Sequence, residues 1–196
     1  FGIVLNKRNR DTVQHKYSII VVARNEEEKI PLLLQSLQNI NYPRDLYEII
    51  LVDDGSQDKT GALMHDMSRT NNNVKSITIT EKDLLGKKTG LQAALETATK
   101  DILLLTDADC IVESDWLSGY NQYWDENTSL VAGYAPETSR LLNQEEIANN
   151  PRKGSTLNNR FRRFIGLVAA GIYAATIGLK IPFSCSGRNM AIKKES

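Results

Sequence analysis

Residues 102–110 have the sequence "ILLLTDADC", an apolar run followed by two carboxylates that stand one residue apart. The run has the composition of a strand that is buried on both faces, as in a parallel sheet. In extended backbone, side chains two residues apart point to the same face, so we expect Asp107 and Asp109 to face one spot at the carboxyl end of the strand. Two like charges held close together repel each other unless a cation lies between them. The stretch therefore predicts a metal ion or a basic side chain beside this pair.

The rest of the chain alternates predicted strands and helices around this stretch. Apolar strands are predicted at residues 17–23, 47–53, 74–80, 101–107 and 129–135, and helices at residues 31–40, 58–70, 90–99 and 114–124. This alternation predicts an α/β fold with a mostly parallel sheet flanked by helices in a single domain. Ligands of such sheets bind at the carboxyl ends of the strands. Three polar segments follow strands there: "ARNEE" (23–27), "DDGS" (53–56) and "DAD" (107–109).

Composition excludes several classes of protein. The chain has 196 residues, which suits one domain, and 24 basic residues balance 24 acidic ones. A neutral chain gives no support to nucleic-acid binding, so no nucleic-acid partner is expected. Cys110 and Cys185 are too few for a disulfide framework and are expected as buried free thiols in a reducing compartment. The most apolar stretch, 164–179, has sixteen residues, whereas spanning a bilayer takes about 20.

Each strand-end motif also has a purely structural explanation. "VDDGS" can be a tight turn in which Asp53 bonds its own backbone, or Asp53 can bond a base or ribose. In "ARNEE", Asn25 can cap a helix and the glutamates suit a helix N-terminus, while Ala23 is small enough for a planar ligand to approach the backbone. Asp-x-Asp can be a polar strand ending, or half of a Mg²⁺ shell that a diphosphate completes.

Two further motifs lie outside these strand ends. "GKKTG" (86–90) is not a phosphate-binding P-loop, because Glu81 stands where that motif needs its first glycine. A lysine there can still pair with a phosphate or an aspartate, or can be a solvated surface residue. In "FSCSGRNMAI" (183–192), Gly187 and Asn189 predict a tight turn that leads into a short strand.

The motifs, taken in their order and spacing, resemble the family 2 glycosyltransferases, which have the Rossmann-like GT-A fold. The matching segments are "SIIVVARNEEEKI", "YEIILVDDGSQDKT", "GKKTGLQAAL", "LLLTDADC" and "CSGRNMAI". The resemblance extends from about residue 17 to residue 192. The form "NYPRDLYEIILVDDGSQDKT" is most similar to the membrane-associated branch, which includes polysaccharide synthases and lipid-glycosylating enzymes.

The resemblance implies roles for individual residues. The loop after the first strand would lie along the nucleoside, Asp53 would bond the base, and Lys87 would lie near the nucleotide and the acidic motif. The loop contacts would be Ala23, Arg24, Asn25 and Glu26. Asp107 would face the ribose or diphosphate and share in metal binding, and Asp109 would bind Mg²⁺ or Mn²⁺. Gly187 and Asn189 would lie near the donor sugar and the acceptor.

The implied reaction is an inverting transfer of a sugar from a nucleoside-diphosphate sugar to a hydroxyl of a glycan or lipid acceptor. UDP is the expected nucleotide ahead of GDP. The metal would neutralise charge on the leaving diphosphate, and a general base would activate the hydroxyl. In this family that base typically follows the "SGRNMAI" region by a few tens of residues, so we expect it beyond Ser196.

We therefore expect an inactive, C-terminally truncated donor-binding fragment of a longer protein. Its expected parts are an N-terminal extension (1–16), a nucleotide-sugar-binding half (17–140) and the start of an acceptor-side part (141–196). Nothing at the start resembles a signal peptide. Residues 157–181 can form a core or lid helix, or a helix at a membrane surface. The full-length protein is expected at the cytoplasmic face of a membrane, and the fragment is expected to be soluble.

Three alternatives remain from the sequence. A receiver domain has its acidic pair after the first strand, whereas here a full strand and helix precede "VDDGS". A non-catalytic nucleotide-sugar-binding module would share every donor-side motif and lack the acidic pair that contains the general base, which the resemblance places beyond Ser196. A nucleotidyltransferase would carry a Gly- and Arg-rich loop after its first strand, where this chain has "ARNEEE".

Overall fold

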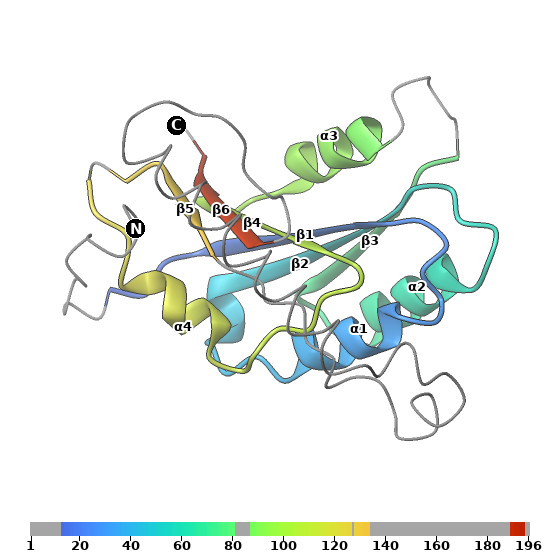
Figure 1. Cartoon of the computed structure of the whole chain (residues 1–196), viewed down its shortest axis with the longest axis horizontal. Helices are drawn as coiled ribbons and strands as arrows, with labels where there is room; N and C mark the ends of the chain where they lie inside the picture. Colours follow the sequence, from blue (N-terminus) through green and yellow to red (C-terminus); the bar gives the residue numbers. More distant parts are fainter. Residues whose placement is uncertain (1–12, 81–86, 127, 134–188, 195–196) are drawn as a thin grey trace, which may run out of the picture. The chain divides into compact units, whose positions relative to one another are not determined.

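The computed structural model describes residues 13–80, 87–126, 128–133 and 189–194, which build one six-stranded sheet with helices against it (Figure 1). The strands are β1 (Tyr17–Ala23), β2 (Tyr47–Asp53), β3 (Val74–Thr78), β4 (Ile102–Asp107), β5 (Leu130–Ala132) and β6 (Asn189–Lys193). The helices are α1 (Ile30–Gln38), the 3-10 turn η1 (Arg44–Leu46), α2 (Thr60–Thr70), α3 (Lys87–Thr97) and α4 (Trp116–Asn121).

The sheet has the strand order β3-β2-β1-β4-β6-β5. Strands β3, β2, β1 and β4 are parallel, β6 runs antiparallel to β4, and β5 runs antiparallel to β6. The expectation of an α/β fold with a mostly parallel sheet is confirmed. The strands belong to one compact unit, Lys7–Ala132 with Ser186–Ser196. A second unit, Phe1–Asn6 with Gly133–Cys185, lies outside the described residues apart from Gly133.

Both faces of the sheet are covered, which explains why its central strands are apolar throughout. In β1, Ile19 and Val21 pack into a core with the buried residues of α1, α2 and α4. Ile20, on the opposite face, packs with Ala94 and Ala98 at the end of α3. Figure 1 shows α3 on one side of the sheet and α1 and α2 on the other. Parallel strands buried on both faces lose the alternation of apolar and polar residues that one-sided sheets show.

The register brings three strand ends to one level. Ala23, the last residue of β1, pairs with Asp53, the last residue of β2. On the other side of β1, Val22 pairs with Asp107, the last residue of β4. The loops that follow these strands therefore begin side by side at one edge of the sheet, as the strand-end rule for ligand sites requires.

The sequence pattern did not predict the place of β6. This strand inserts between β4 and β5, and its first residue Asn189 pairs with Thr106. Pairing of this kind joins residues far apart in the chain, and periodicity within either segment contains no information about it. The short strand expected after Asn189 is nevertheless present.

Several expectations fall outside the described residues. These are the helix expected within 157–181, the free thiol of Cys185 and the turn at Gly187. The division at residue 140 also lies outside the described residues and stays a prediction. Of the helices that the structure does describe, none combines the length and apolar character needed to cross a bilayer.

Candidate functional site

The loop between β1 and α1 has a conformation set by Asn25. This residue has a φ of 54°. Such left-handed backbone is uncommon for residues other than glycine, and asparagine is one of the few that adopt it readily. Helix α1 begins after Lys29, its N-cap, whose side chain makes no capping bond in the described part of the chain. The expectation that Asn25 caps a helix is therefore wrong, and the glutamates precede the helix instead of lying in its first turn.

The β1–α1 loop is bonded to the β2–α2 loop through three successive backbone amides. The N–H groups of residues 25, 26 and 27 each donate to a different side chain across the gap between the loops. The acceptors are Ser56 Oγ at 3.0 Å, Thr60 Oγ1 at 2.8 Å and Asp58 Oδ2 at 3.1 Å, respectively. Backbone donors in a loop of this kind need partners, and here side chains of the neighbouring loop provide them.

The reverse set of bonds runs between the same two loops. The backbone N–H of Gln57 donates to Asn25 Oδ1 at 2.8 Å, and that of Lys59 donates to Glu27 Oε2 at 2.9 Å. We call these reciprocal bonds between residues 25–27 and 56–60 the loop clasp. Because each loop donates its backbone to side chains of the other, neither loop can change its conformation without breaking bonds to its neighbour.

Asp53 lies beneath the clasp and is almost fully buried. One carboxylate oxygen accepts the N–H of Ser56 at 2.9 Å, in a turn that also contains Gly55 with a φ of 66°. The other carboxylate oxygen lies directly against Gly61 in the first turn of α2, where a Cβ would overlap it. The expected turn, in which Asp53 bonds its own backbone, is thus confirmed. A contact from Asp53 to a base remains a prediction.

The acidic pair does not have the geometry that the sequence predicted. Strand β4 ends at Asp107, and the chain turns at the next two residues, with the N–H of Cys110 donating to the carbonyl oxygen of Asp107 at 3.2 Å. Side chains two residues apart share one face only in extended backbone, so the expected common orientation does not extend to Asp109. Asp107 is half-buried, whereas Asp109 is exposed and accessible to a cation from solvent.

The acidic pair suits a cation that a ligand helps to bind. In the described ranges, no group of three or more His, Cys, Asp or Glu side chains could hold a metal ion by itself. Mg²⁺ takes oxygen ligands and commonly uses one or two carboxylates together with substrate phosphates. Asp107 and Asp109 fit that role, with a diphosphate completing the shell.

A basic side chain that no sequence motif predicted also lies near the pair. Lys29 bonds Glu26, with 3.0 Å between Nζ and Oε2. The pKa of Lys29 is raised, first by this hydrogen bond and by the charge of Glu26, and further by the charge of Asp109. The fold thus brings Lys29 into the electrostatic range of the acidic motif from a separate loop. Lys87 is the first residue of α3, and its side chain lies outside the described residues.

Asn189 lies beside the acidic motif through its pairing with β4. Its side-chain oxygen accepts hydrogen bonds from Trp116 Nε1 at 3.0 Å and from the Tyr120 hydroxyl at 2.7 Å. Helix α4 therefore fixes the amide of Asn189 one strand away from Thr106, the residue before Asp107.

Comparison with known proteins identifies the family. Residues 18–177, most of the chain, match the family described as "Glycosyl transferase family 2". The chain belongs to glycosyltransferase family 2. This membership excludes the receiver and nucleotidyltransferase alternatives. The solved structures that match the chain have the GT-A fold, which agrees with the observed sheet.

Relatives of this family 2 chain show what similar proteins do. The chain is 34% identical over 100 residues to a beta-monoglucosyldiacylglycerol synthase of Trichormus variabilis, covering 51% of this chain and 21% of that protein. The mannosyltransferase PcManGT of Pyrobaculum calidifontis, solved with GDP-Man and Mn²⁺, is 28% identical with a TM-score of 0.56, over 62% of this chain and 36% of its own. TarS 1-349 of S. aureus, solved with UDP-GlcNAc, is 27% identical with a TM-score of 0.55, over 64% and 36%. The chain thus spans a minor part of each of these relatives.

Cys110 of the family 2 chain follows the acidic motif and is a free cysteine, as expected, although it is half-buried. Burial is the main cause that raises the pKa of its thiol, and the nearby charges of Asp109 and Asp107 add to the effect. The thiol is therefore protonated at neutral pH and is a poor nucleophile.

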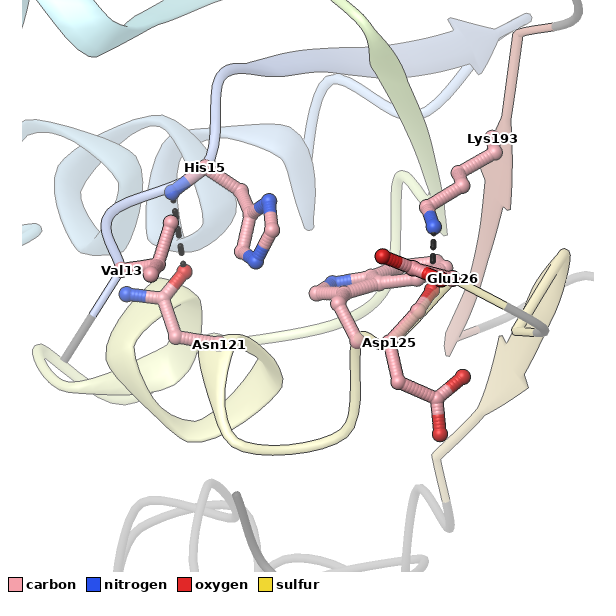
Figure 2. Close-up of a pocket in the computed structure, with 7 residues that line it drawn as sticks. Val13, His15, Asn121, Asp125, Glu126 and Lys193 are labelled. Carbon is pink, nitrogen blue, oxygen red and sulfur yellow. Dashed lines mark hydrogen bonds between the residues drawn. The ribbon is translucent and has the colours of Figure 1, made fainter. Parts of the chain in front are cut away.

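A pocket of about 260 Å³ lies at the opposite end of the sheet from the acidic motif (Figure 2). His15 precedes β1, and Lys193 pairs with Ile102, the first residue of β4, so the pocket is at the amino ends of these strands. In Figure 2 the His15 amide bonds Asn121 and Lys193 reaches the backbone of Asp125. Burial and the charge of Lys193 lower the pKa of His15. This pocket lacks the strand-end motifs and is not the candidate site.

Proposed function

We propose that this glycosyltransferase family 2 chain binds a nucleoside-diphosphate sugar at the carboxyl ends of β1, β2 and β4. The observation that supports this most directly is the register, which aligns Ala23 with Asp53 and Val22 with Asp107. It brings the clasped loops and the acidic motif to one edge of the sheet, where ligands of parallel sheets bind. The donors bound by the two solved relatives, GDP-Man and UDP-GlcNAc, belong to the same chemical class.

In this proposal the site divides into a nucleoside side and a diphosphate side. Ala23, Arg24, Asn25 and Glu26 lie along the nucleoside, and Asp53 bonds the base. Asp107 and Asp109 hold Mg²⁺ or Mn²⁺, which neutralises negative charge on the leaving diphosphate. Lys87 lies on the diphosphate side, and Gly187 and Asn189 lie toward the donor sugar and acceptor. UDP is the proposed nucleotide ahead of GDP.

We further propose that the whole protein is an inverting transferase that acts on a hydroxyl of a glycan or lipid. The beta-monoglucosyldiacylglycerol synthase relative supports a lipid acceptor. We propose the cytoplasmic face of a membrane as the place of the whole protein. The aligned part of the chain covers 36% of each solved relative's length, and we propose that the chain is the donor-binding part. A general base within hydrogen-bond reach of the acceptor hydroxyl is then expected in sequence after Ser196, and this chain alone is expected to bind donor without turnover.

Calorimetric titration of UDP and GDP into the chain, with and without Mn²⁺, tests the donor site. The informative variant is Asp109→Asn, and the matched control is Asp101→Asn, which removes an exposed carboxylate just before the amino end of the same strand. We expect tighter binding with Mn²⁺ in the wild type and in Asp101→Asn, and no metal effect in Asp109→Asn. If neither nucleotide binds the wild type, the proposed function is wrong for this chain.

A further inference from the structure

The side chains of Ser56, Asp58 and Thr60, at the end of the β2–α2 loop and the start of α2, accept hydrogen bonds from backbone amides of the neighbouring β1–α1 loop. Ser56 Oγ and Thr60 Oγ1 accept the amides of Asn25 and Glu26. Both oxygens of Asp58 are also engaged, since Oδ1 accepts the N–H of Thr60 at 2.9 Å and Oδ2 accepts the N–H of Glu27. These groups therefore have partners within the protein in the absence of any ligand.

The same bonds determine what the β1–α1 loop can offer a ligand. A run of backbone N–H groups at the end of a strand can form an anion-binding concavity when the groups point outward together. Here the amides of residues 25–27 point to the β2–α2 loop, so they are not available to a phosphate. The loop can instead offer its exposed side chains and the surface at Ala23. The β1–α1 loop is then expected to contact the nucleoside, whereas the acidic motif and nearby basic side chains bind the diphosphate.

The clasp joins the two loops that are proposed to contact the nucleoside. Asp54, next to Asp53, donates its N–H to the carbonyl oxygen of Ala23 at 2.9 Å, which fixes the base of both loops. Thr60 is fully buried, so solvent cannot replace its bond to Glu26. Given the nucleotide site proposed above, we propose that Ser56, Asp58 and Thr60 are positioning residues, which hold the β1–α1 loop in its nucleoside-binding conformation without contacting the nucleotide.

Two variants test this role. Thr60→Val keeps the shape of the side chain and removes the acceptor for the Glu26 amide, and Thr60→Ser restores it. Ser56→Ala is the milder second variant, because its bond to Asn25 is exposed and its loss is expected to leave folding intact. The control is Ser18→Ala, which removes a buried hydroxyl that links Glu48 and Lys100 near the amino end of β1.

The measurement is the dissociation constant of UDP, with and without Mn²⁺, for each folded variant. Loss of one positioning hydrogen bond predicts about five- to tenfold weaker binding for Thr60→Val and about two- to threefold for Ser56→Ala. The ratio of the constants with and without Mn²⁺ is expected to stay as in the wild type, because the clasp acts on the nucleoside side. Thr60→Ser should bind like the wild type, and so should Ser18→Ala.

The outcomes separate this inference from the proposed function. If the wild type binds UDP and both Thr60→Val and Ser56→Ala bind it as tightly as Ser18→Ala, the clasp is structural only and the inference is overturned. A Thr60→Val variant that loses only the Mn²⁺ enhancement also overturns it, because the residue would then act on the diphosphate side. A wild type that binds neither UDP nor GDP overturns the proposed function and the positioning role with it.

Discussion

The polar groups at the two ends of the sheet form hydrogen bonds with different kinds of partner. At the amino end, the buried carboxylate of Glu48 accepts bonds from Ser18, Thr99 and Lys75, at 2.6 to 2.9 Å. At the carboxyl end, the clasp joins two loops through backbone amides and short polar side chains, and Asp109 stays exposed. The charge of Glu48 is satisfied inside the protein, whereas the carboxyl end has exposed charged groups, among them Arg24, Glu27 and Asp109, beside the buried Asp53. We therefore expect the first network to contribute stability and the second to prepare a surface for a ligand.

The pKa of Glu48 supports a structural role for the network at the amino end. Burial of Glu48 raises its pKa, but the hydrogen bonds from Lys75, Thr99 and Ser18 together outweigh burial and lower the pKa to about 2. A carboxyl group held in this way is ionised at every physiological pH. It has no free capacity for proton transfer, so it is a structural group.

The largest expected effect comes from removing the amino-end carboxylate. Glu48→Ala leaves the buried hydroxyl of Ser18 and the amide of Thr99 without their acceptor, and should lower the free energy of unfolding by about 3 kcal/mol. Urea unfolding measures this loss. Lys75→Met is the control, because the Lys75 side chain is 43% exposed and such ion pairs contribute about 1 kcal/mol or less. Equal losses in the two variants would contradict the central place given to Glu48. UDP affinity of folded Glu48→Ala should not change.

A pH series tests the stabilising role of Glu48 in a second way. Because the pKa of Glu48 is about 2 in the folded protein and 4.5 in the reference state, its contribution is fully present above pH 4.5 and is lost as the pH falls toward 2. The difference corresponds to about 3 kcal/mol. Glu48→Gln cannot titrate, so the stability gap between wild type and Glu48→Gln should narrow as the pH falls through this window. A gap that stays constant from pH 6 to pH 2.5 would show that the pKa of Glu48 is not lowered by folding.

Smaller effects are expected from two helical glycines. A Cβ at Gly90 in α3 would lie 3.0 Å from Val22 Cγ1 and 3.3 Å from Val52 Cγ1, so Gly90→Ala should destabilise the protein by about 1–2 kcal/mol through overpacking. Gly119 in α4 has no neighbour within 4 Å of a Cβ, and Gly119→Ala should stabilise it by about 0.5–1 kcal/mol through helix propensity. Thermal melts of both variants check the signs. A neutral Gly90→Ala would mean that α3 can move away from the sheet at no cost.

The local sequence pattern was sufficient to predict those strands whose bounds are determined by burial of apolar side chains. The bounds of β1 and β2 agree with the predicted strands at 17–23 and 47–53, because continuous apolar runs there end sharply in polar residues. The predicted end of the third strand was less accurate, since β3 ends at Thr78 and not at residue 80. The predicted place of the site followed from the same strand ends, together with the rule for parallel sheets.

The remaining features depend on contacts between distant segments. The clasp pairs residues about thirty positions apart, and none of its side chains differs in type from ordinary turn residues. Lys29 is an unremarkable surface lysine in the sequence, and only the fold brings it near Asp109. The two carboxylates were expected on one face, but that needs extended backbone as far as Asp109, and the chain turns at residues 108 and 109, directly after the strand end at Asp107.

Mapping of backbone amide NMR shifts on addition of UDP with Mg²⁺ tests most directly that the two ends have different roles. We expect shifts in residues 24–27, 53–60 and 107–110, and no shifts at Ser18 or in residues 99–100 at the amino end. Shifts concentrated at the amino end, or around the pocket of His15 and Lys193, would contradict the placement of the nucleotide at the carboxyl ends of β1, β2 and β4.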